Sequence, residues 1–235
     1  WNGKKVGSFG IMSTWSFYVA HHMTTAEGGM VLTDSKELDI ILKELREFGR
    51  DKEYSGERYG MNKGNLKDFD ERYTFHRVGW NFRMADAPAS FGIQQLAKLD
   101  DMNKIRLKYA EYLIDNLSQF SQYLQIPSKN TDYNVNTFYS FPIVIKKNTK
   151  IQRKNFVHYL EAHGIETRAI MCGTLPDQPS LCDKIGIEYG DLNQSRYIKD
   201  NGFFIGCHPC LEEDDLKYVI ETITNYFKQQ GDILQ

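Results

Sequence analysis

The chain has 235 residues, of which 41% are hydrophobic and 26% are charged, so it has enough apolar content for an ordinary globular core. Its formal net charge of -2 gives no electrostatic reason to expect a nucleic acid or an anionic membrane as a partner. No apolar run approaches the roughly 20 residues that cross a bilayer. Four cysteines are too few for a disulfide scaffold of this size, which favours a reducing, cytoplasmic setting.

The first part of the chain predicts two short strands and a helix. Residues 9–18 are rich in β-branched and aromatic side chains, and residues 30–33 form a second apolar run after a pair of glycines. A helix is expected to begin at a cap formed by Asp34 or Ser35 and to end at about Phe48. Its leucines and isoleucine recur on one face, as in a helix that packs against a core.

The next segments predict a long loop followed by a long helix. Residues 50–75 are polar and show no period, and a loop of this length inside a compact protein is usually functional or disordered. Asp86 and Pro88 indicate the first turn of a helix, where proline is tolerated, and the apolar positions continue to about Leu117. A helix of this length often links two domains.

The rest of the chain predicts a small α+β domain. The expected strands are 138–145, 165–170 and 203–207, and the expected helices are 152–163 and 213–227. We therefore predict two domains, residues 1–118 and residues 119–235. The first has too few strands to close a sheet by itself, and the chain begins with Trp1 rather than Met. Both observations predict that an N-terminal half is absent and that this chain alone does not turn over substrate.

Three short segments carry the most informative patterns. Residues 16–29 read Ser-Phe-Tyr-Val-Ala-His-His-Met-Thr-Thr-Ala-Glu-Gly-Gly, residues 79–84 read Gly-Trp-Asn-Phe-Arg-Met, and residues 92–96 read Gly-Ile-Gln-Gln-Leu. Together they resemble the DegT/DnrJ/EryC1/StrS nucleotide-sugar aminotransferase/dehydratase family, whose segments read approximately S-F-x-x-x-K-x-I-T-T-G-E-G-G, G-x-N-x-R-M and G-x-x-Q-L. The resemblance covers about residues 1–230. It implies an α/β fold, the pyridoxal phosphate (PLP)-dependent transferase fold type I, of which this chain is the C-terminal portion.

The resemblance also implies roles for individual residues. Ser16 would contact the phosphate of the cofactor, which is PLP or its amine form, pyridoxamine phosphate. Asn81 would cross a homodimer interface to the phosphate in the partner subunit. His21 takes the place of the lysine that holds the cofactor. Arg83 and Arg168 are expected to bind the sugar nucleotide or the carboxylate of glutamate, because guanidinium binds such groups bidentately.

The histidine at position 21 decides which activity is expected. A lysine amine can hold PLP covalently as an imine, whereas imidazole cannot form that bond but is a good general base near neutral pH. This pattern resembles the PLP-dependent 3-dehydratases of deoxysugar pathways. In that branch the histidine removes a proton from the C4′ carbon of the cofactor, and the C3 hydroxyl of a 4-keto-6-deoxy sugar nucleotide leaves. The product is a 3,6-dideoxy-4-keto sugar for polysaccharide biosynthesis.

A cysteine-rich loop separates two kinds of 3-dehydratase. The kind with an iron–sulfur cluster carries its cysteines after Gly-Arg-Asp, which here is residues 49–51. Lys52 and Tyr54 follow in this chain, and the next cysteine is Cys172. Because the thiolate ligands of such a cluster are absent from this loop, we expect the cluster-free kind. That kind acts on GDP-4-keto-6-deoxymannose in colitose biosynthesis and regenerates its amine from L-glutamate.

Other interpretations stay open. The chain could be an aminotransferase of the same fold in which another lysine supplies the amine, or a non-catalytic member that has lost its lysine. Ser16 could be an ordinary strand serine, Asn81 and Arg83 could cap the helix that follows, and Arg168 could be a surface arginine.

A Cys-x-x-Cys pattern at residues 207–210 could belong to a metal or redox site. A structural zinc site needs four ligands, and the sequence contains no second Cys-x-x-Cys pair. We therefore expect no metal site here and interpret the segment as the end of a strand entering a turn.

Overall fold

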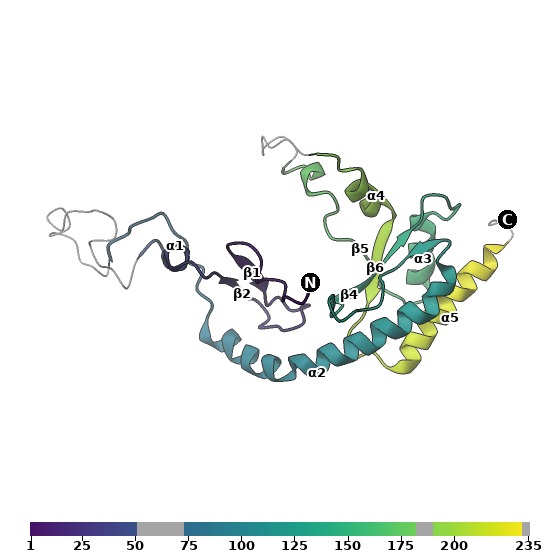
Figure 1. Ribbon diagram of the computed structural model, residues 1–235, viewed down its shortest axis with the longest axis horizontal. Coiled ribbons are helices and arrows are strands. Elements are labelled where there is room, and N and C mark those ends of the chain that lie inside the picture. The colour runs from purple at the N-terminus through teal and green to yellow at the C-terminus, as the bar shows by residue number, and fades with distance from the viewer. Residues whose placement is uncertain (51–72, 182–189, 232–235) are drawn as a thin grey trace. The chain divides into compact units, whose positions relative to one another are not determined.

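The computed structural model describes residues 1–50, 73–181 and 190–231 (Figure 1). The loop expected at residues 50–75 lies outside these residues except at its two ends. The chain divides into two compact units, Trp1–Leu99 and Asp100–Gln235, within the long helix. The predicted boundary after residue 118 falls at the C-terminal end of that same helix, and the assignment of domains remains a prediction.

Unit 1 contains a short antiparallel hairpin and one complete helix. Strand β1 (Ser13–Ser16) pairs with β2 (Gly29–Leu32). Ser13 lies opposite Leu32, so β1 is shorter than the predicted strand because β2 offers only four partners. Helix α1 (Lys36–Arg46) begins at the predicted cap, where the Ser35 hydroxyl accepts a hydrogen bond from the amide of Leu38.

The end of α1 explains why the helix stops before the predicted residue. Phe48 and Gly49 adopt φ angles of 65° and 88°, in the left-handed region that an α-helix cannot continue through. The amide of Gly49 instead donates to the carbonyl of Glu44 at 2.7 Å, which closes the last turn. The chain leaves α1 at Glu47.

The long helix is confirmed where the sequence predicted it. Helix α2 spans Asp86–Leu117, with Pro88 in its first turn, and runs from unit 1 into unit 2. Its last two turns lie in the core of unit 2, where Leu113 and Leu117 are fully buried. No helix in the described part of the chain is both long enough and apolar enough to cross a membrane.

Unit 2 is built on an antiparallel sheet of four strands in the order β3-β4-β6-β5. The strands are β3 (Leu124–Gln125), β4 (Ser140–Ile145), β5 (Thr167–Ala169) and β6 (Gly202–Gly206), and the helices are α3 (Arg153–Ala162), α4 (Asn193–Asn201) and α5 (Glu213–Gln229), with the 3₁₀ turns η3 (Ser118–Phe120) and η4 (Leu175–Asp177). Along β4, Phe141, Ile143 and Ile145 are buried and alternate with half-buried residues, as expected for a strand with one face on a core.

Aromatic side chains join the helices of unit 2 to its sheet. Phe156 of α3 packs edge-on against Phe203 of β6 and is stacked on Tyr226 of α5, with ring centroids 5.6 Å and 4.5 Å apart. Phe227 of α5 stacks on Phe120 at 4.4 Å. These contacts, with the strand residues above, form one core for the whole unit.

A buried arginine ties three distant segments of unit 2 together. The Arg106 side chain on α2 is 2% exposed, and its guanidinium donates to the carbonyls of Phe138, Tyr139 and Cys207 at 3.4, 3.3 and 2.8 Å. The acceptors lie before β4 and directly after β6. Arg106 therefore holds α2 to both central strands of the sheet.

The Cys-x-x-Cys segment follows β6 directly. Cys207 is buried, its thiol contacts the carbonyl of Arg106, and burial raises its pKa to about 11. Cys207 and Cys210 are both free thiols, and the amide of Leu211 donates to the carbonyl of His208 in a turn. Among the residues that the structure describes, no group of three or more His, Cys, Asp or Glu side chains is arranged to hold a metal ion.

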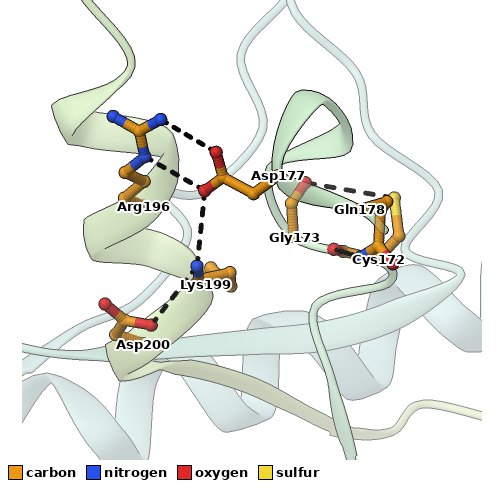
Figure 2. Close-up of polar contacts among 7 residues, drawn as sticks. All are labelled: Cys172, Gly173, Asp177, Gln178, Arg196, Lys199 and Asp200. Carbon is orange, nitrogen blue, oxygen red and sulfur yellow. Dashed lines mark hydrogen bonds and ion pairs between the residues drawn. The ribbon is translucent and has the colours of Figure 1, made fainter. Parts of the chain in front are cut away.

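Charged side chains join η4 to α4. Helix α4 was not predicted from the sequence. Figure 2 shows Asp177 accepting from Nε and a second guanidinium nitrogen of Arg196, at 3.0 and 2.8 Å, and from Lys199 at 3.5 Å. The hydrogen bond from Arg196 lowers the pKa of the Asp177 carboxyl below its usual value. Gln178 donates to the carbonyl of Cys172 at 2.6 Å in the same loop. The loop after β5 is thereby held against α4.

Candidate functional site

The first motif forms the loop of the β1–β2 hairpin. Ser16, the last residue of β1, pairs with Gly29, the first residue of β2. Inside the loop, the amide of Phe17 donates to the carbonyl of Gly28, and the amide of Thr25 donates to the carbonyl of Phe17, both at 2.9 Å. The Thr25 hydroxyl donates to the carbonyl of Glu27 at 2.8 Å. The motif is therefore a loop whose two ends are fixed by backbone hydrogen bonds.

The structure brings Ser16 and His21 together within this loop. Nδ1 of His21 lies 3.3 Å from the carbonyl oxygen of Ser16, and the amide of His21 donates to the carbonyl of Tyr18 at 3.0 Å. A carbonyl oxygen can only accept, so this contact is a hydrogen bond when the ring carries a proton on Nδ1, and a neutral ring then has its lone pair on Nε2. The Ser16 hydroxyl accepts from the amide of Tyr18 at 3.3 Å and keeps its own proton for donation. The pair thus offers a hydrogen-bond donor and a base.

Packing in unit 1 joins the other two motifs to this loop. A Cβ atom added to Gly28 would lie 2.5 Å from the Thr25 hydroxyl and 3.0 Å from the Met84 methyl group. A Cβ atom added to Gly92 would lie 3.1 Å from the Thr25 methyl group. Gly28 of the first motif therefore lies close to Met84 of the second. Thr25, which is 2% exposed, lies close to Gly92 of the third. The close approaches explain why glycine occupies both positions.

Asn81 and Arg83 lie against the C-terminal end of α1. Asn81 forms an isolated antiparallel bridge with Glu47 and is exposed. One guanidinium nitrogen of Arg83 lies 3.0 Å from Oε1 of Glu47, and its guanidinium lies 5.8 Å from the centre of the Phe48 ring. Arg83 is thus engaged within the chain. Its role toward substrate remains a prediction.

Arg168 belongs to unit 2, on the edge strand β5. Its guanidinium pairs with Glu166, two residues earlier, at 2.5 Å, and the two side chains are 70% and 74% exposed. An exposed pair of this kind contributes little to stability, so the guanidinium can exchange partners easily. Substrate binding by Arg168 remains a prediction.

Unit 1 also contains a cavity of about 580 Å³ that the sequence analysis missed. It is lined by β2, one face of α1 and the rings of Trp80 and Phe82, which are stacked with centroids 5.6 Å apart. These rings alternate along the chain with Asn81 and Arg83, as side chains do in an extended segment. The alternation of aromatic and polar residues from 80 to 83 is the signal that could have predicted it.

Comparison with known proteins places the chain in a family. Residues 1–224 match the DegT/DnrJ/EryC1/StrS aminotransferase family. The chain belongs to this family. It is 32% identical to the lipopolysaccharide biosynthesis protein RfbH of Salmonella typhimurium, over 97% of this chain and 54% of the relative. It is 31% identical to dTDP-4-dehydro-2,6-dideoxy-D-glucose 3-dehydratase of Saccharopolyspora spinosa, over 96% of this chain and 50% of the relative. The chain thus spans about half the length of the curated relatives that it matches.

Solved structures confirm the expected fold. The structure of E. coli GDP-4-keto-6-deoxy-D-mannose-3-dehydratase with bound hydrated PLP matches with a TM-score of 0.82 and 29% identity, over 94% of this chain and 56% of the other. A GDP-4-keto-6-deoxymannose-3-dehydratase with a trapped PLP-glutamate geminal diamine matches with a TM-score of 0.80 and 29% identity, over the same shares of both chains. These structures support PLP, or its amine form, as the cofactor.

The chemistry of Ser16, His21 and Asn81 fits such a cofactor when it is held without a covalent bond. The hydroxyl of Ser16 and the exposed amide of Asn81 are donors suited to a phosphate group. Position 21, which carries a lysine in the pattern of the family, provides an imidazole whose Nδ1 contacts the Ser16 carbonyl. These three residues therefore provide hydrogen-bond donors for an anion, from Ser16 and Asn81, and a base, from His21.

Proposed function

We propose that the complete protein is a PLP- and pyridoxamine-phosphate-dependent 3-dehydratase. Its substrate would be a 4-keto-6-deoxy sugar nucleotide, GDP-4-keto-6-deoxymannose, and its product a 3,6-dideoxy-4-keto sugar nucleotide for polysaccharide biosynthesis. L-Glutamate would restore the amine form of the cofactor. The enzyme would work in the cytoplasm as a homodimer with shared active sites.

One observation carries the proposal: a histidine stands where the aminotransferase pattern has its lysine, and the hairpin loop places Nδ1 of that histidine 3.3 Å from the Ser16 carbonyl oxygen. With the Nδ1 proton in this contact, Nε2 is the ring nitrogen that would accept a proton. Imidazole is a good general base near neutral pH. The presence of several 3-dehydratases among the similar proteins supports the proposal.

Each candidate site residue has a separate task in this proposal. Ser16 and, from the partner subunit, its own copy of Asn81 would hold the cofactor phosphate by hydrogen bonds. His21 would take the proton from C4′ at Nε2, while Nδ1 would keep its own proton and donate it to the Ser16 carbonyl. Bound pyridoxamine phosphate supplies the electron sink that lets the C3 hydroxyl depart. Arg83 or Arg168 would bind an anionic group of the nucleotide or of glutamate.

A second function is an aminotransferase, favoured by the description of the family itself. It requires a lysine other than residue 21 to serve as the amine. The complete protein incubated with pyridoxamine phosphate, glutamate and either a GDP- or a dTDP-linked 4-keto-6-deoxy sugar separates the two by mass spectrometry. Loss of the C3 oxygen supports the dehydratase, and replacement of the C4 oxygen by an amine supports the aminotransferase. An unchanged sugar would leave only a non-catalytic role.

The loop sequence after residue 51 yields a separate prediction about metal content. The complete protein purified without oxygen is expected to contain no stoichiometric iron or acid-labile sulfide, because Lys52 and Tyr54 stand where cluster-bearing dehydratases have cysteines. Dehydration should proceed without a reductase. Iron and sulfide present in equal, stoichiometric amounts would contradict the assignment to the cluster-free kind.

A further inference from the structure

Two buried carboxylates at the end of α1 hold the segment that contains Asn81. Oε2 of Glu44 lies 2.6 Å from Nε of Arg77, and Oε1 of Glu47 lies 3.0 Å from a guanidinium nitrogen of Arg83. The two glutamate side chains are 1% and 5% exposed, whereas the two arginine side chains are 37% and 50% exposed. Along the sequence, Asn81 lies between the two arginines.

The backbones of the two segments are in direct contact. The amide of Trp80 donates to the carbonyl of Leu45, and the amide of Phe48 donates to the carbonyl of Trp80, both at 2.8 Å. Gly49 has a φ of 88°, and a Cβ atom there would lie 1.8 Å from the carbonyl oxygen of Arg77. Only glycine allows so close an approach. The backbone of residues 77–83 therefore runs along the end of α1, and no side chain at residue 49 separates the two segments.

A buried carboxylate is stable only when partners replace the water that it has lost. Arg77 and Arg83 are among the partners that replace this water, and both arginine side chains are partly exposed. Arg50, with a guanidinium nitrogen 3.9 Å from Oε1 of Glu47, adds positive charge at the same carboxylate. The acid–arginine pairs thus fix both ends of residues 77–83, and the exposed Asn81 is presented between them.

We propose that Glu44 and Glu47 are positioning residues for Asn81. They act through Arg77 and Arg83, and they set the place from which the Asn81 amide reaches the cofactor phosphate. This inference rests on the proposed function, in which Asn81 binds that phosphate. It also gives Arg83 a task inside its own subunit, whatever its contact with substrate.

A double-mutant cycle on cofactor affinity in the complete protein tests the proposal. Glu47→Gln is expected to raise the dissociation constant of pyridoxamine phosphate roughly tenfold or more, since a misplaced Asn81 would lose its hydrogen bond to the charged phosphate. The same substitution made in an Asn81→Ala background should have almost no effect. Saturating cofactor should bring the turnover of Glu47→Gln back toward that of the parent. Glu44→Gln should behave in the same way and carries the test if Glu47→Gln does not fold.

Asp39→Asn is the matched control, because the pair between Asp39 and Lys43 lies on the same helix with side chains 48% and 51% exposed. It should leave the dissociation constant unchanged. An equal loss of affinity with and without Asn81 would mean that the glutamates support only the fold, and would overturn the inference. A parent-like affinity of both glutamine variants would also overturn it. Failure of the parent protein to bind the cofactor at all would instead refute the proposed function, on which the inference depends.

Discussion

His21→Asn in the complete protein is expected to lower the rate of C3 dehydration by roughly 10²–10⁴-fold, the usual contribution of a general base. Asparagine is close to histidine in size and can still donate to the Ser16 carbonyl, but it cannot accept a proton near neutral pH. The cofactor should therefore remain bound through Ser16 and Asn81. Single-turnover kinetics together with a cofactor titration measure both effects.

His22→Asn is the control, since the neighbouring histidine is half-buried and has no assigned role in proton transfer. It should cost far less rate. His21→Lys provides the opposite test: borohydride should attach PLP to the lysine variant and not to the parent, while dehydration is suppressed. A His21→Asn protein that dehydrates its substrate at the parent rate would contradict the proposed role of His21 as the general base.

Arg106→Ala is expected to lower the free energy of unfolding of unit 2 by roughly 3–4 kcal/mol, because it leaves buried carbonyl acceptors without a donor and opens a cavity. The three acceptors are the carbonyls of Phe138, Tyr139 and Cys207. Denaturant unfolding followed by near-ultraviolet circular dichroism measures the change.

Arg196→Gln is the matched control for this prediction. Arg196 also makes several charged hydrogen bonds, but its side chain is 49% exposed, and such a pair contributes at most about 1 kcal/mol. The two arginine substitutions should therefore differ several-fold in their effect. Equal stabilities of Arg106→Ala and the parent would show that the buried guanidinium does not hold the unit together.

Local signals in the sequence predicted much of the fold. The cap at Ser35, the proline in the first turn of α2 and the alternation along β4 all act within a few residues, so they could be read without tertiary structure. Helix α4 was missed because Asn193–Asn201 is mostly polar. Strand β3 was missed because its two residues are a strand only through their pairing with β4.

The candidate site also contains some features that can be predicted from local sequence and others that depend on tertiary contacts. Two adjacent histidines after a strand carry no distinctive pattern, so His21 could be singled out only through resemblance to a family. The contacts of Glu44 and Glu47 were missed because their arginine partners lie 33 and 36 residues further along the chain, and only the folded backbone brings them together. Sequence patterns predicted which residue types the site uses, whereas their partners depend on tertiary packing.

The reach of Arg106 along the sequence bears on how the chain is synthesised. Two of its carbonyl acceptors lie 32 and 33 residues away, and the third, at Cys207, lies 101 residues away. At a translation rate of about 5–20 residues per second, some seconds separate the appearance of the guanidinium from that of its last acceptor. During that interval the Cys207 carbonyl is not yet available to Arg106. A nascent chain released before residue 207 would lack part of the core that surrounds β4, because α5 (Glu213–Gln229) contributes Ile223, Tyr226 and Phe227 to it.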